Sequence, residues 1–263
     1  SDRPSGLAPS NIQGAFDLRN VSYTYPDADK PVLRNINIEI AAGESIAIVG
    51  RIGSGKSTLL KLFTRMIDTP DACLYIDGHD VNDYPLSQLR QQVSQVLQDS
   101  FLFGEPLYSN ISYDDPERNL ELIWDAAESA SLRGSIDDFP MKMHTIVGER
   151  GVTLSGGQKQ RATLARGLIR NAPVLILDDC FSSVDTKTEE HILSRLKRLR
   201  AGKTTILVSH RISTLRHSDR IVVLEAGEIV EIGSHEALLE LNGAYAQLER
   251  AQTLSDESLA VQG

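Results

Sequence analysis

The sequence predicts an α/β fold with a mostly parallel sheet, a smaller antiparallel β part and an inserted helical region. Short apolar segments at 45–49, 174–177 and 205–208 are typical of strands that are buried on both faces of a parallel sheet. Apolar residues recur with helical spacing at 119–132 and 159–170. Because strands and helices alternate along the chain, an α/β architecture is expected.

The remaining elements are expected to be largely antiparallel. Residues 16–26 and 32–44 carry β-forming residues in alternation. Asp77-Gly78 stands between two β-prone arms and predicts a hairpin. Two further segments complete the pattern: a β-rich return at 220–233 and a helix at 235–250.

The predicted organisation is one large domain over residues 15–250, with the helical part inserted at about 99–166. Residues 1–14 are polar and contain Pro and Gly, so they are expected to form a linker. Residues 251–263 are expected to form a flexible tail.

Charge and composition exclude several classes of function. The formal net charge is −9, which disfavours a basic face for DNA or RNA, so no nucleic-acid partner is expected. The chain contains only two cysteines, which disfavours a disulfide framework or a structural zinc site. No apolar run approaches the roughly 20 residues that a membrane-spanning helix needs.

The stretch GRIGSGKST follows the apolar segment at 45–49 and opens a helical pattern. It fits the motif GxxxxGK[ST] and predicts a P-loop NTPase core that binds ATP with Mg²⁺. Glycines let backbone N–H groups turn toward phosphates, Lys56 can reach the β- and γ-phosphates, and the Ser57 hydroxyl can ligate Mg²⁺. The predicted ATP-binding residues of this stretch are Gly50, Arg51, Ile52, Gly53, Ser54, Gly55, Lys56, Ser57 and Thr58.

A second phosphate-related signal lies in VLILDDCFSSVD, at 174–185. A buried strand that ends in an aspartate is where P-loop enzymes carry the acid that holds Mg²⁺. Asp178 is therefore the predicted partner of Ser57 in binding the metal.

LSGGQKQR, at 154–161, together with the P-loop, resembles the signature of ABC ATPases, and the resemblance covers about residues 15–250. It implies the ABC ATPase fold. In that family the signature contacts the γ-phosphate bound to a second subunit, so that two ATP molecules lie between two domains. The residues expected to act in this way, on the partner's nucleotide, are Leu154, Ser155, Gly156, Gly157 and Gln158.

Other positions match the family pattern one at a time. Tyr25 resembles the aromatic residue that stacks on adenine, although a strand tyrosine more often serves packing. Gln98 resembles the glutamine that senses Mg²⁺ and the attacking water, and His210 resembles the histidine that contacts the γ-phosphate. Asp185 lies in the loop that crosses to the partner subunit. TIVGERG, at 145–151, resembles the segment that exporters use to touch their transmembrane helices.

Asp179 departs from the family pattern, in which the residue after the Mg²⁺-binding aspartate is usually a glutamate that polarises the attacking water. The carboxylate is retained but shortened by one methylene, or roughly 1.5 Å. A misplacement of about 1 Å can cost about a hundredfold in rate. We therefore expect Asp179, Gln98 and His210 to form the catalytic set of a site that binds ATP well and hydrolyses it slowly.

The resemblance favours the exporter branch, in which this domain follows six membrane helices in a half-transporter. The expected partners are that transmembrane domain and a second nucleotide-binding domain, and the expected location is the cytoplasmic face of the cell membrane. A heterodimer, with this chain carrying the degenerate site, is favoured over a homodimer.

Three other functions compete with this one. A soluble ABC ATPase acting on DNA or ribosomes is disfavoured because the chain is acidic, has one P-loop, and leaves no room for a long coiled-coil insertion between Lys56 and Ser155. A module in which ATP only joins two domains gains some weight from Asp179. The ATPase subunit of an importer remains a third alternative. The sequence does not identify the exported substrate.

Overall fold

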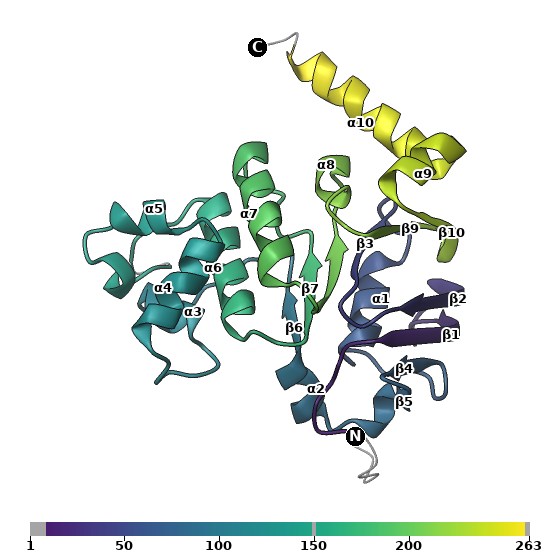
Figure 1. Ribbon diagram of the computed structural model, residues 1–263, viewed down its shortest axis with the longest axis horizontal. Coiled ribbons are helices and arrows are strands. Elements are labelled where there is room, and N and C mark those ends of the chain that lie inside the picture. The colour runs from purple at the N-terminus through teal and green to yellow at the C-terminus, as the bar shows by residue number, and fades with distance from the viewer. Residues whose placement is uncertain (1–8, 149–150, 261–263) are drawn as a thin grey trace.

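The structure is a computed structural model that describes residues 9–148 and 151–260. A six-stranded sheet runs through its centre in the order β10-β9-β3-β8-β7-β6 (Figure 1). Neighbouring strands are parallel, except for the antiparallel pair β9 and β10. The predicted mostly parallel sheet is therefore confirmed. The strands are β3 (Ser45–Val49), β6 (Val93–Val96), β7 (Val174–Asp178), β8 (Thr204–Val208), β9 (Arg220–Glu225) and β10 (Glu228–Gly233).

Alternate side chains of the central strands enter two different cores, as the two-residue period of a strand requires. Ile46 and Ile48 of β3 pack in a first core with α1 (Lys56–Phe63). Leu175 and Leu177 of β7 pack on the other face in a second core. The helices that contribute to this second core include α4 (Leu120–Ser129), α6 (Gly156–Ile169) and α7 (Thr186–Leu199).

A second, antiparallel sheet packs against the first core, in the order β2-β1-β4-β5. Its tight turn is at Asp77 and Gly78, where both residues have positive φ, 50° and 81°. Two positive φ values in succession are typical of the hairpin turn that the sequence predicted. The strands are β1 (Phe16–Tyr23), β2 (Leu33–Ile40), β4 (Leu74–Ile76) and β5 (His79–Asp80).

A group of helices separates β6 from β7 along the chain and lies to one side of the sheet (Figure 1). Its first member begins at Leu107 and its last ends at Ile169. The described helices here are α3 (Leu107–Ile111), α4, α5 (Arg133–Asp137), the 3₁₀ helix η2 (Lys142–His144) and α6. A 3₁₀ turn, η1 (Val81–Asp83), and α2 (Leu86–Gln92) come before them.

The two ends of the described chain differ from the sequence expectations. Ile12, inside the predicted linker 1–14, is only 2% exposed and belongs to the first core. The carboxylate of Asp77 accepts the backbone N–H groups of residues 13–15, which ties this segment to the hairpin. A flexible tail was expected from residue 251, but helix α10 (Ala244–Ala260) continues through residues 251–260.

Helix α10 projects away from the sheet after the short helices α8 (Ile212–Leu215) and α9 (His235–Leu241) (Figure 1). Leu215, Leu238 and Tyr245, one from each of these helices, pack with β3 and β9 in a third core. Within 9–148 and 151–260, no helix combines the length and the apolarity that crossing a bilayer requires.

Candidate nucleotide-binding site

The phosphate-binding loop connects the end of β3 to the start of α1, as the motif predicts. A Cβ atom added to Gly50 would lie 2.1 Å from the carbonyl oxygen of Leu224, so only glycine fits there. Gly55 has φ 104° and caps α1. Gly53 also has positive φ, and a Cβ atom there would meet no atom within 4 Å, so this side of the loop is open. The loop is therefore closely packed at Gly50 and open at Gly53.

Lys56 lies folded into this loop. Its Nζ donates to the carbonyl oxygens of Gly50 and Arg51 at 2.7 and 3.0 Å. Burial lowers the pKa of Lys56, while Asp178 and Asp179 act in the opposite direction. The hydroxyl of Ser54 is buried and, within the described structure, has no hydrogen-bond partner. Both groups suit an anion, because an ammonium and a free hydroxyl can each donate to phosphate oxygens.

The two acids stand at the end of β7. Asp178 is the last residue of the strand, and the backbone N–H of Asp179 donates to Val208 at the end of β8, at 2.9 Å. Asp179 has φ 44°, a left-handed conformation that aspartate tolerates better than most residues. Its carboxylate accepts a hydrogen bond from Gln98 at 3.2 Å and another from the backbone of His210. The predicted catalytic residues Asp179, Gln98 and His210 are thus brought together.

The electrostatics of these acids fit a divalent cation. Burial is the main cause that raises the pKa of both Asp178 and Asp179, and the neighbouring negative charge of Asp179 raises the pKa of Asp178 further. Lys56 offsets only part of this. Ser57 is exposed in the first turn of α1 and supplies a hydroxyl. Carboxylate, hydroxyl and amide oxygens are the hard ligands that Mg²⁺ prefers, so Asp178, Ser57 and Gln98 fit the predicted metal.

Tyr25 lies beside the phosphate-binding helix. A hydrogen bond of 3.1 Å joins its hydroxyl to that of Thr58 in α1. Its ring meets the ring of Tyr23 edge to face, with 5.1 Å between centroids. These contacts place Tyr25 at the P-loop, and its stacking on adenine stays a prediction.

The signature residues begin the 14-residue helix α6. Ser155 is the N-cap: its hydroxyl accepts from the backbone of Gln158, and Gln158 accepts from the backbone of Ser155. Leu154 is buried, whereas Ser155 and Gly156 are exposed. A Cβ atom on Gly157 would lie 2.7 Å from the carbonyl oxygen of Ser183. The signature therefore presents free backbone donors at a helix N-terminus while packing closely on the next loop.

The structure does not bring this signature to the P-loop of the same chain. Helix α1 belongs to the first core and α6 to the second, on opposite faces of the sheet. Asp185 is the N-cap of α7, where its carboxylate accepts from the backbone of Thr188 at 3.0 Å.

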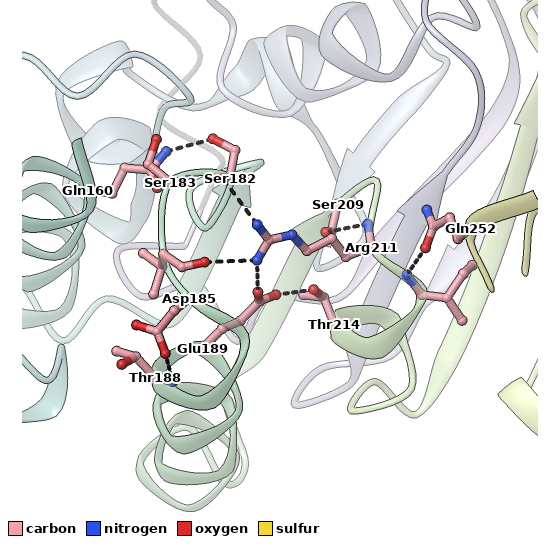
Figure 2. Close-up of polar contacts among 12 residues, drawn as sticks. Gln160, Ser182, Ser183, Asp185, Thr188, Glu189, Ser209, Arg211, Thr214 and Gln252 are labelled. Carbon is pink, nitrogen blue, oxygen red and sulfur yellow. Dashed lines mark hydrogen bonds and ion pairs between the residues drawn. The ribbon is translucent and has the colours of Figure 1, made fainter. Parts of the chain in front are cut away.

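Several residues that the sequence did not single out connect these motifs (Figure 2). Gln160 in α6 donates to the Ser182 hydroxyl and accepts from the backbone of Ser183, both at 2.8 Å. Arg211 donates to the carbonyl oxygens of Ser182 and Val184 at 3.1 and 2.9 Å. The loop 182–185 is thereby fixed between α6 and the residue after His210.

Two further residues complete this arrangement. Glu189, which is 2% exposed, accepts from Arg211 and from the hydroxyl of Thr214. Gln252 of α10 accepts from the backbone of Ile212 at 2.9 Å (Figure 2). Adjacency to LSGGQ and to His210 was a signal for Gln160 and Arg211. Glu189 and Gln252 carried none, since each depends on contacts between distant segments. Of the predicted segment TIVGERG, Glu149 and Arg150 lie outside the described residues.

Comparison with known proteins identifies the family to which these motifs belong. The ABC transporter family model matches residues 33–182. The chain is 45% identical over 240 residues to the ATP-dependent lipid A-core flippase of Escherichia coli, covering 91% of this chain and 41% of that protein. The flippase of Photobacterium profundum is 44% identical over 244 residues, with 92% and 42% covered. This chain thus spans less than half the length of these relatives.

A solved structure gives the same result for the fold. A bacterial Atm1-family ABC exporter with ATP bound superposes with a TM-score of 0.91 at 38% identity, covering 96% of this chain and 44% of that one. Fold and site together define a P-loop ATPase that uses ATP and Mg²⁺. More particularly, the chain belongs to the ABC transporter family and is one of its ATP-binding domains.

Proposed function

We propose that this chain hydrolyses ATP in a sandwich with a second ATP-binding domain, and that this hydrolysis powers export across a membrane. The observation that carries the proposal is the separation of its two phosphate-directed motifs. Lys56 begins helix α1, which covers one face of the central sheet, whereas Ser155 caps helix α6 on the opposite face. Each chain can then hold one nucleotide with its P-loop and complete its partner's site with its signature.

The roles of the residues follow from their contacts. Bound Mg²⁺ would neutralise phosphate charge, and Ser57 and Asp178 are the groups that would hold it. Gln98 and Asp179 already share a hydrogen bond, so they would act on the same water molecule. His210 lies next to Asp179 and would contact the γ-phosphate.

We infer that the site built on this chain's own P-loop is slow. The Asp179 side chain is one methylene shorter than the glutamate of the family pattern, and its carboxylate is already engaged by Gln98 and the backbone of His210. Binding should be affected little, because Lys56, Ser57 and the loop amides do not depend on Asp179. The same observation favours, as a second candidate, a module in which ATP chiefly holds two domains together.

Complementation between two disabled variants tests the composite site. Lys56→Ala removes the phosphate-binding ammonium, and Ser155→Arg places a bulky cation at the signature. Each variant alone should have little ATPase activity, but an equimolar mixture at high protein concentration should recover part of the wild-type rate. Recovery is expected because the mixed dimer contains one site with both an intact P-loop and an intact signature. A mixture as inactive as its components contradicts the sandwich, and measurable ATP binding without any turnover supports the second candidate.

We also propose where the transmembrane partner docks. Phe101, Tyr113 and Leu97 are unusually exposed for large apolar side chains, at 64%, 60% and 44%. The ring of Phe103 stacks on Tyr113, with 4.7 Å between centroids, and contacts Phe101 edge to face. An adjoining groove of about 220 Å³ includes Asp99, which follows Gln98 directly. We propose that a helix of the transmembrane domain binds in this groove. Such a helix would contact Asp99, which directly follows the catalytic Gln98.

The docking proposal is tested in the assembled transporter. Phe101→Asp should uncouple transport from ATP hydrolysis, because a charged side chain would oppose an apolar contact. ATP binding by the chain itself should stay unchanged. Full transport by this variant would show that the partner docks elsewhere.

A further inference from the structure

Helix α10 is anchored to the body of the protein at its first turn. The carboxylate of Glu231 on β10 accepts the backbone N–H groups of Ala244 and Tyr245, two of the donors that a helix start leaves free. Tyr245 is fully buried, and its hydroxyl bonds to Nδ1 of His235 at 2.8 Å. The helix therefore starts from a fixed point on β10 and α9.

Gln252 stands two helical turns after Tyr245, on the same face of α10. Its side-chain amide uses both of its ends. Oε1 accepts the backbone N–H of Ile212 at 2.9 Å, and Nε2 donates to the backbone carbonyl of His210. One side chain thus holds the backbone on both sides of Arg211; Figure 2 shows the bond on the Ile212 side.

These bonds supply what the local sequence lacks. Ile212 begins the four-residue helix α8, and Arg211 at its N-cap makes no side-chain capping bond. The free N–H of Ile212 therefore depends on Gln252 for its partner. The His210 side chain is itself exposed, so packing does not fix the residue.

The opposite side of the segment is held by Arg211. Its guanidinium bonds to the loop 182–185 and to the buried carboxylate of Glu189. His210 is consequently set between two attachments, one to the loop that follows the catalytic acids and one to α10. The second attachment comes from outside the catalytic machinery.

We propose that Gln252 is a positioning residue for His210, through which helix α10 sets the catalytic geometry. This inference rests on the proposed function, in which His210 contacts the γ-phosphate. A shift of about 1 Å in a positioned group can reduce a rate by up to two orders of magnitude. Because Gln252 acts on the backbone and not on the nucleotide, kcat should fall while KM for ATP changes little.

The test compares three substitutions in the full chain, assayed at a protein concentration that gives turnover. Gln252→Met keeps the length of the side chain and removes both hydrogen bonds, and kcat should fall by about five- to twentyfold with KM within about twofold. Gln252→Glu keeps the acceptor for Ile212 but loses the donor to His210, and a similar loss is expected. Gln247→Met is the matched control, because Gln247 is an exposed glutamine on the same helix, and its kcat should stay at the wild-type value.

A double-substitution cycle separates positioning from general destabilisation. If Gln252 acts through His210, Gln252→Met should add no further loss to His210→Ala. Amide hydrogen exchange at Ile212 should accelerate in Gln252→Met and stay slow in Gln252→Glu. Losses that multiply in the double variant overturn the proposal, and so does an unchanged kcat in Gln252→Met. If His210→Ala alone does not reduce the ATPase rate, the proposed function is overturned as well. Failure of the positioning role and failure of the proposed function are therefore distinguishable.

Discussion

Gln98 donates a hydrogen bond from Nε2 to Oδ2 of Asp179 over 3.2 Å. The two residues follow neighbouring parallel strands, β6 and β7, and meet at the carboxyl ends of those strands. Such edges are where open α/β sheets place their ligands. The bond joins the residue expected to orient water to the residue expected to polarise it. It also draws the short Asp179 side chain toward Gln98.

Asp179→Glu should raise the ATPase rate, provided that an intact partner signature is present. The longer side chain would return the carboxylate toward the water, and the positioning argument allows a gain of up to about a hundredfold. The left-handed φ of 44° at this position will reduce the gain somewhat, because glutamate adopts left-handed backbone conformations less readily than aspartate. The measurement is single-turnover hydrolysis, with Asp179→Asn as the control that keeps the shape and removes the charge. No gain with unchanged ATP affinity would mean that another step limits hydrolysis.

Removing the buried carboxylate of Glu189 should destabilise the protein strongly. Glu189→Ala leaves Arg211, whose side chain is 37% exposed, without its counter-ion, and it leaves the buried Thr214 hydroxyl without its acceptor. Leaving a buried donor unsatisfied typically costs about 1–3 kcal/mol. Glu190→Ala is the matched control: Glu190 also bonds an arginine, Arg216 at 2.7 Å, but both side chains are about half exposed. Its loss should be under about 1 kcal/mol. Urea unfolding of the two variants measures the difference, and equal losses would contradict the role given to Glu189.

Much of the fold was predictable because local chemistry decided it. The apolar runs that became β3, β7 and β8 could be buried on both faces only in a central parallel sheet. Asp77-Gly78 determined the hairpin because both residues adopt positive φ without much strain. The P-loop was likewise specified by its glycines, since Gly50 has no room for a side chain.

Other features could not be predicted because they depend on distant contacts. The burial of Ile12 follows from bonds that its neighbours make to Asp77, far along the chain. The continuation of α10 beyond residue 250 has no helical signal in the polar sequence there. Gln252 lies in the segment that the sequence predicted to be a flexible tail, and only the fold brings it to His210.

Stability at alkaline pH should depend on Tyr84. Its ring is 1% exposed, its hydroxyl donates to the carbonyl of Ile76 at 2.9 Å, and burial raises its pKa from 10.0 to about 12. The pKa is higher in the folded state, so the contribution of Tyr84 is fully present below pH 10 and is lost as pH rises through 12. The expected slope is roughly 1.4 kcal/mol per pH unit within that window. Tyr84→Phe should lack this part of the slope when urea unfolding is measured at both ends of the window, and identical slopes would contradict the prediction.

The last prediction separates a heterodimer from a homodimer. In a heterodimer, this chain contributes Asp179 to the slow site and its signature to the partner's competent site. Ser155→Arg, made in this chain only, should then abolish most turnover of the assembled transporter, because the cation blocks the helix N-terminus that meets the partner's γ-phosphate. Asp179→Ala should leave most turnover in place, since the partner would carry the faster chemistry.

In a homodimer, by contrast, both sites are equivalent and every chain carries the substitution, so both changes should be severe. The readout is the steady-state ATPase rate of the assembled transporter, with Gln247→Ala as a control that lies outside both motifs. A loss from Ser155→Arg at least tenfold greater than the loss from Asp179→Ala supports the heterodimer. Comparable losses contradict it and make Asp179 the working, if slow, base of two identical sites.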